Sequence, residues 1–263
     1  MRKGSFPANE IRRPGAYATA MEAFYWSFEA SALFALWGCL LGSVPRGDGH
    51  PVLVLPGFAT NDRMTVFLRH FLGVLGYRVF PWNLGWNLDH HTVGINGEHI
   101  ALEIECIRAE AGQDVSLVGW SLGGVIAREA ARRNPAGVRQ VIALGSPFAG
   151  DPDATSLSLL YALATGKNPR SPEARARSRR GAQPLPVHST AIFSRCDGIT
   201  AWENCIGTTD RITENIEVRS SHFGFMVNPG VYFVVADRLA QKPGEWQPFE
   251  KRGGFSDFYF PGL

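Results

Sequence analysis

The sequence predicts an α/β domain built on a mostly parallel, six-stranded sheet with helices on both faces. Short apolar runs alternate with segments of helical periodicity along most of the chain. Several runs are continuously apolar rather than alternating, as expected for parallel strands that are buried on both faces. The length of 263 residues suits one such domain with a modest insertion.

The expected elements follow one another in a regular order. Strands are predicted at residues 51–55, 76–80, 115–118, 138–144, 189–193 and 215–218. Helices are predicted at residues 65–73, 94–111, 122 to about 133, and 229–240. Residues 151–187 interrupt this alternation with a helix at 154–164 and an Arg-, Ser- and Pro-rich loop at 167–186. A long excursion between two strands often covers a site, so this insertion is predicted to form a cap.

The N-terminal region, residues 1–48, is predicted to be an apolar helix and a linker that precede the α/β domain, residues 49–263. The apolar stretch at 16–41 carries Glu22 and Glu29, which would strongly disfavour a membrane-spanning helix. Helical spacing places both acids on one face. Packing against the domain is the favoured role, and an interfacial helix with peripheral membrane contact is the alternative.

Composition and the first residues narrow the functional class and location. The net charge of +2 is too small to indicate a nucleic-acid partner, and no ordinary signal peptide is visible, so a cytoplasmic protein, membrane-peripheral in the alternative, is expected. The four cysteines show neither a disulfide framework nor metal-ligand spacing. Cys196 and Cys205 are near enough in sequence to bridge, although two free thiols are favoured.

The stretch Val-Ser-Leu-Val-Gly-Trp-Ser-Leu-Gly-Gly at residues 115–124 carries the predicted chemistry. It has the form of a strand, a Gly-x-Ser-x-Gly turn and the start of a helix, which is the setting of a nucleophile elbow. A serine hydroxyl is a poor nucleophile unless it is exposed beside a base and hydrogen-bond donors. Ser121 is therefore the predicted nucleophile. Side chains at Gly119 and Gly123 would crowd the turn or the neighbouring strand.

A serine nucleophile needs a base, and the base needs an orienting acid. The reactive groups of an open parallel sheet gather beyond the carboxyl ends of its strands. His222 follows the last predicted strand and Asp197 the one before it, so they are the predicted base and acid. Asp151 and Asp153, beyond the preceding strand, are the substitute acids.

The oxyanion of an acyl-transfer intermediate needs two preorganised N–H donors. The backbone N–H groups of Leu122 and of Phe58, in the loop after the first strand, are predicted to supply them. Among the other histidines, His50 lies at the wrong end of the sheet. Asp89, His90 and His91 lack further ligands at useful spacing, so solvated loop residues are favoured there and no metal site is predicted.

These segments resemble the bacterial α/β-hydrolase superfamily, and within it the lipase-like and esterase-like members. The resemblance covers roughly residues 49–241 and rests on the segments 52–58, 119–123, 145–148, 194–202 and 221–224. It implies Ser121 as nucleophile, Asp197 as acid and His222 as base, in the chain order usual for that family. The sequence departs from many lipases in having Pro56-Gly57 in place of His-Gly. It also has the apolar helix where the family has strands before the first parallel one.

The resemblance and the triad together imply hydrolysis of a small-molecule or lipid carboxylic ester through an acyl-enzyme on Ser121, without a cofactor. Aromatic residues near the expected pocket favour an apolar acyl group, with Trp120, Phe148 and Phe223 as predicted substrate contacts. Amidase, thioesterase or acyltransferase chemistry on the same triad remains open. A catalytically silent binding protein with the hydrolase fold is a further alternative. The sequence does not indicate an oligomeric state.

Overall fold

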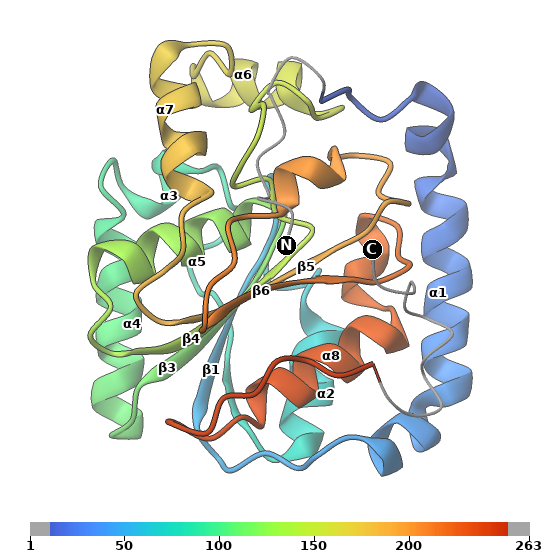
Figure 1. Cartoon of the computed structure of the whole chain (residues 1–263), viewed down its shortest axis with the longest axis vertical. Helices are drawn as coiled ribbons and strands as arrows, with labels where there is room; N and C mark the ends of the chain where they lie inside the picture. The colour runs from blue at the N-terminus through green and yellow to red at the C-terminus, as the bar shows by residue number, and fades with distance from the viewer. Residues whose placement is uncertain (1–10, 252–263) are drawn as a thin grey trace.

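An open sheet of six parallel strands forms the centre of the computed structural model, which describes residues 11–251 (Figure 1). The strands lie in the order β2-β1-β3-β4-β5-β6, and every neighbouring pair is parallel. Their bounds are β1 (Pro51–Leu55), β2 (Arg78–Phe80), β3 (Val115–Trp120), β4 (Val138–Leu144), β5 (His188–Phe193) and β6 (Thr213–Glu217). The predicted six-stranded parallel sheet is confirmed, and each strand lies within two residues of its expected bounds.

Helices cover both faces of the sheet, so there is a hydrophobic core on each side. In β1, Val52 and Val54 point into one core while Leu53 and Leu55 point into the other, because successive strand residues face opposite ways. This two-sided burial explains why the strand is apolar throughout. On the valine side lie α1 (Ala16–Ser43), α2 (Val66–Leu75) and α8 (Pro229–Leu239); on the leucine side lie α4 (Glu98–Ala111) and α5 (Leu122–Arg133).

Outside the insertion, two helical segments depart from the prediction: one begins later than expected, and the other was not predicted. The helix expected from residue 94 starts at Glu98, because Gly94 and Gly97 both adopt positive φ angles that a helix cannot use. The histidine pair that was expected in a loop forms a one-turn helix, α3 (His90–Val93). Two short 3₁₀ helices, η2 (Trp202–Cys205) and η3 (Phe223–Met226), follow β5 and β6.

The insertion between β4 and β5 contains two helices, α6 (Ser158–Thr165) and α7 (Pro172–Gly181), which lie at the top of Figure 1. The prediction of a loop at 167–186 was therefore wrong, and the helix predicted at 154–164 begins later than expected, at Ser158. Ser171 accepts a hydrogen bond from the Ala174 N–H as the N-cap, and Pro172 occupies the first turn. A capping serine followed by proline starts a helix even where the composition suggests a loop.

Helix α1 runs along one side of the molecule beside α8 and η3 (Figure 1). Glu22, Glu29, Leu33 and Leu40 form its buried stripe, so the prediction that both acids share one face is confirmed. Much of its remaining surface is exposed. Among the described residues it is the one helix that is long and apolar enough to cross a membrane.

Candidate active site

Ser121 occupies a strained turn between β3 and α5. Its φ of 53° and ψ of −122° are unusual for a residue with a side chain, and such strain is found where the surrounding structure enforces it. A Cβ atom on Gly119 would lie 2.4 Å from the Gly124 nitrogen, and one on Gly123 would lie 2.4 Å from the Leu55 carbonyl oxygen. The expected crowding at both glycines is therefore confirmed, and the motif permits the turn.

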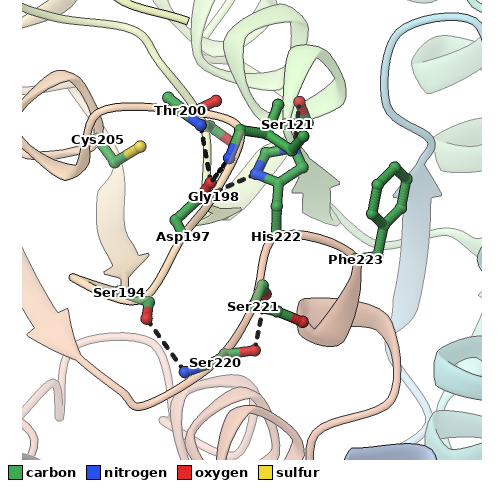
Figure 2. A network of polar contacts seen from close by, with 12 residues as sticks. Ser121, Ser194, Asp197, Gly198, Thr200, Cys205, Ser220, Ser221, His222 and Phe223 are labelled. Carbon is green, nitrogen blue, oxygen red and sulfur yellow. Dashed lines mark hydrogen bonds and ion pairs between the residues drawn. The ribbon is translucent and has the colours of Figure 1, made fainter. Parts of the chain in front are cut away.

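The structure brings Ser121, His222 and Asp197 together at the carboxyl edge of the sheet (Figure 2). His222 Nε2 lies 3.1 Å from Ser121 Oγ, and His222 Nδ1 lies 2.7 Å from Asp197 Oδ2. The three residues follow β3, β5 and β6, as the strand-end rule predicts. When the Nδ1–H group donates a hydrogen bond to the carboxylate, Nε2 is unprotonated and can accept the serine hydroxyl proton.

Asp197 is held in its orientation by its own loop. Its Oδ1 accepts hydrogen bonds from the backbone N–H groups of Ile199 at 2.9 Å and Thr200 at 2.7 Å, which leaves Oδ2 for His222. Both contacts fix the carboxylate without competing with the histidine. The side chain therefore has the placement that an orienting acid requires.

The electrostatic surroundings of His222 favour its protonated form. Burial alone would lower the pKa of the imidazole, but the charge and hydrogen bond of Asp197, together with the charge of Glu22, raise that pKa above its ordinary value of 6.5. Such a site stabilises the imidazolium that forms when the serine proton is taken.

The two substitute acids are engaged elsewhere. Asp153 forms ion pairs with Arg13 and Arg170, at 2.5 Å and 2.9 Å. Asp151 Oδ1 accepts the N–H of Asp153, two residues along its own loop. The carboxylate that accepts the His222 Nδ1–H hydrogen bond is that of Asp197.

The predicted oxyanion donors flank the nucleophile. Leu122 begins α5 directly after Ser121, and Phe58 follows Gly57 in the loop after β1. A Cβ atom on Gly57 would lie 3.3 Å from Ser121 Cβ, so this loop passes close beside the nucleophile. Among the backbone hydrogen bonds of residues 11–251 that join the surrounding loops, none uses the Leu122 or the Phe58 N–H. Their role as an oxyanion hole stays a prediction.

A cavity of about 590 Å³ opens beside Ser121. The body of the domain and the cap both supply apolar side chains to its wall, among them Phe58, Leu122, Val125, Ile126, Phe148, Leu157 and Tyr161. Phe148 therefore lies where a substrate contact was predicted. Arg128 stacks over its ring at 3.8 Å.

Trp120 and Phe223 do not belong to the described wall of this cavity, so their role as substrate contacts stays a prediction, which the burial of Trp120 disfavours. Trp120 is only 2% exposed, and its indole N–H donates to the His222 carbonyl at 3.0 Å. Phe223 packs against the Trp120 ring. Adjacency to Ser121 in sequence does not set the direction of a side chain, because neighbouring residues in a strand point to opposite faces. Both rings thus support the histidine loop.

Sequence reasoning missed the contribution of α1 to this site. Glu22 Oε1 accepts hydrogen bonds from the Gly198 N–H at 2.7 Å and the His222 N–H at 3.0 Å, and its Oε2 accepts the Phe223 N–H at 3.1 Å. Glu29 accepts from the Ser221 N–H and hydroxyl and from the Asn228 amide. The available signal was a pair of carboxylates seven residues apart in an otherwise apolar helix.

Asp89 joins the domain to the cap. It precedes His90 and His91, and no metal site was predicted for these three residues. Its carboxylate forms an ion pair with Lys167 and accepts a hydrogen bond from the Tyr161 hydroxyl. No cluster of three metal-ligating side chains occurs within residues 11–251. Cys196 and Cys205 are both free thiols, as the favoured interpretation predicted.

A second Ser-His-Asp arrangement lies at the opposite edge of the sheet. His50 Nε2 lies 2.8 Å from Ser116 Oγ, and its Nδ1 contacts Asp48. Both His50 and Ser116 are completely buried, and burial lowers the pKa of His50. Asp48 is exposed, but the serine and histidine are inaccessible to a substrate and belong to the core.

No protein-family model matches this sequence, and no curated protein sequence matches it either. Solved structures do match. Lipase B of Aspergillus fumigatus is 24% identical with a TM-score of 0.60, over 75% of this chain and 54% of that one, so this chain spans about half the length of that lipase. The monoacylglycerol lipase of Paleococcus ferrophilus is 18% identical with a TM-score of 0.53, over 74% and 96% of the two chains. Lipase BlEst2 of Bacillus licheniformis is also 18% identical, with a TM-score of 0.53 over 73% and 92%.

Proposed function

We propose that this chain, which has the α/β-hydrolase fold, is a serine hydrolase that cleaves carboxylic esters through an acyl-enzyme on Ser121. The observation that carries the proposal is the hydrogen-bonded series Ser121–His222–Asp197 beside a largely apolar cavity. The shared fold supports it, since the three similar structures are lipases. No step of the proposed reaction requires a cofactor.

In the first half of the reaction, Ser121 Oγ attacks the ester carbonyl carbon while His222 Nε2 takes its proton. The tetrahedral oxyanion is stabilised by the Leu122 and Phe58 N–H groups. The C–O bond to the alcohol then breaks, and His222 gives its proton to the leaving alkoxide oxygen. The products of this half are a free alcohol and an acyl-Ser121 ester.

In the second half, water attacks the acyl carbon while His222 Nε2 takes one of its protons. The bond to Ser121 Oγ breaks, and the serine regains a proton from His222. A carboxylic acid leaves and the enzyme returns to its starting state. Asp197 holds the imidazole orientation through both halves.

The cavity favours a substrate with an apolar acyl group. A volume of about 590 Å³ falls within the range of sites that enclose a small organic ligand. Phe58, Val125 and Phe148 present apolar surface to it, and burying an acyl chain there gains roughly 0.8 kcal/mol for each methylene group.

The proposal is tested with a fluorophosphonate probe and a series of p-nitrophenyl esters of increasing chain length. The wild-type protein is expected to be labelled and to hydrolyse the esters, and Ser121→Ala is expected to lose both activities. Ser43→Ala, an exposed serine at the end of α1, is the matched control and should retain both.

Failure of the folded wild-type protein to label would overturn the proposal in favour of a silent binding protein. Amide or thioester analogues run beside the esters test the choice of substrate. Faster turnover of either analogue class than of every ester would overturn the ester assignment while leaving the triad in place.

A further inference from the structure

Helix α1 directs its two carboxylates inward, onto the loops that carry the acid and the base. A helix on the surface of a globular protein ordinarily turns its charged residues toward water. Here Glu22 is 3% exposed and Glu29 is 9% exposed, within a helix that has no other charged residue. Burying a carboxylate is costly unless hydrogen bonds compensate for the lost water, so both positions require an explanation.

The Glu22 carboxylate bridges two loops that are far apart in sequence. Gly198 directly follows Asp197 in the loop after β5, and His222 and Phe223 lie in the loop after β6. One side chain accepts the N–H groups of all three residues, across 176 to 201 positions of sequence. A Cβ atom on Gly198 would lie 2.9 Å from Glu22 Oε1, so the contact is close.

We propose that Glu22 is a positioning residue, which fixes the loop of Asp197 against the loop of His222 and so keeps the imidazole in line with Ser121. This inference rests on the proposed function. Glu29 binds only one of the two loops, at Ser221 and Asn228. It therefore anchors the histidine loop to α1 but does not connect that loop to the acid.

The three contacts require a carboxylate rather than an amide. Each partner of Glu22 is a backbone N–H donor, and an ionised carboxylate only accepts. In Glu22→Gln the side chain keeps its shape, but an NH₂ group must face at least one of the N–H donors. That loop then shifts or loses its partner, and the charge that helps to raise the pKa of His222 is removed.

The test compares Glu22→Gln with the wild type on a water-soluble short-chain ester, with the fraction of competent sites counted by fluorophosphonate titration. We expect kcat per labelled site to fall by about 10- to 100-fold with KM within twofold, the size of effect that loss of alignment produces. The acid limb of the pH profile of kcat/KM should move to lower pH, because His222 faces the charges of Asp197 and Glu22 and loses one of them.

Two further variants separate positioning from folding. Glu22→Asp keeps the charge but has a shorter side chain. Its kcat should therefore fall, while the acid limb of its pH profile should move less than that of Glu22→Gln. Glu29→Gln should lower the melting temperature with a smaller loss of kcat per labelled site. An unchanged kcat per labelled site and an unchanged acid limb in Glu22→Gln would overturn the proposal. A wild type without turnover or labelling would instead overturn the proposed function.

The outward face of α1 supports a second, independent inference. Its exposed side chains include a series of large aromatic residues: Tyr17, Phe24, Tyr25, Trp26, Phe28 and Phe34. No exposed residue of the helix is charged, over 28 residues or roughly 42 Å. The polarity of the helix is thus inverted, with acids toward the protein and apolar groups outward, which is the arrangement of helices in lipid.

We propose that this face docks on a phospholipid bilayer surface, with α1 lying along the surface. Arg12 and Arg46 are exposed and lie near the two ends of the helix in sequence, and their positive charges favour an anionic lipid surface, although Arg46 also donates a hydrogen bond to the Val74 carbonyl. The buried contacts of Glu22 and Glu29 hold α1 on the domain, so it lies at the surface rather than crossing the bilayer.

Co-sedimentation of the full chain with phosphatidylcholine–phosphatidylglycerol vesicles tests this proposal. The wild type is expected to bind, and the triple variant Phe24→Ser/Phe28→Ser/Phe34→Ser should bind at least 10-fold more weakly. Phe67→Ser, at an exposed position on α2, is the matched control and should bind as the wild type does.

Two outcomes would overturn the lipid assignment. One is equal sedimentation of the wild type with and without vesicles. The other is the absence of vesicle binding together with a concentration-dependent dimer that analytical ultracentrifugation detects in the wild type but not in the triple variant. That result would identify a second copy of this chain as the occupant of the face. Neither outcome depends on ester turnover.

Discussion

Asp197 divides its two carboxylate oxygens between its own loop and His222, which makes its replacement informative. In Asp197→Asn the amide can keep one contact only by disturbing the other, so the imidazole loses the partner that fixes its tautomer. We expect kcat for a p-nitrophenyl ester to fall by about 10²- to 10⁴-fold. Asp153→Asn, which alters an acid paired with Arg13 and Arg170, should keep kcat near the wild-type value. A nearly active Asp197→Asn would exclude Asp197 as the acid.

The pH dependence of turnover follows from His222. The base must be neutral to accept the Ser121 proton, and burial is more than offset by Asp197 and Glu22, so its pKa lies above 6.5. We therefore expect kcat/KM to increase with pH and to reach half its plateau above pH 6.5. A rate profile measured across the range in which the fold is intact checks this. A half-maximum below pH 6.5 would show that another group controls the reaction.

The placement of Ser121, Asp197 and His222 could be predicted because each follows a strand, and the ends of parallel strands meet at one edge. The role of Glu22 could not, since its partners lie 176 to 201 residues away, and the pair of carboxylates in an apolar helix indicates only that they share a face. The direction of the Trp120 side chain could not be predicted from the sequence either, because it depends on how β3 packs against the loop that carries His222.

At the scale of single elements, the junction of β3 and α5 has almost no room for added atoms. Gly119→Ala and Gly123→Ala would each place a methyl group 2.4 Å from backbone atoms that cannot move freely. We expect either variant to unfold at a markedly lower temperature, with a loss of about 3 kcal/mol or more, or to fail to accumulate as folded protein. Thermal denaturation measures this.

The matched control is Gly73→Ala, in the helix α2, where an added Cβ meets nothing within 4 Å. Alanine is favoured over glycine in a helix by about 0.5–1 kcal/mol, so this variant should be slightly more stable than the wild type. Destabilisation of all three variants to the same degree would contradict the steric explanation.

The elements themselves were largely predictable, because continuous apolar runs and helical periodicity report burial directly. The strand 138–144 was predicted with the bounds that the structure shows for β4. Helix α7 was not, since its arginine- and serine-rich composition resembles that of a loop, and its start depends on one capping contact at Ser171. A cap is a single hydrogen bond, which composition and periodicity do not reveal.

At the scale of the whole molecule, the cap is joined to the domain through Asp89. Its carboxylate meets Lys167 and Tyr161, while the Tyr161 ring packs edge-on against Phe58 at 5.3 Å. Asp89→Asn retains a residue type that tolerates the positive φ of 57° but removes the charge. We expect KM for a long-chain ester to rise several-fold with kcat within twofold. A steady-state comparison with a short-chain ester, whose KM should change less, checks the prediction.

A serine, a histidine and an aspartate lie together at both the amino ends and the carboxyl ends of the parallel strands. The two sets differ in whether a substrate can reach the serine. Ser116 and His50 are sealed in the core, whereas Ser121 lines a cavity. A search by interatomic distance alone would therefore count two catalytic triads in this chain. Only one of them should react. Saturating fluorophosphonate is expected to add a single phosphonyl group per molecule, on a peptide that contains Ser121.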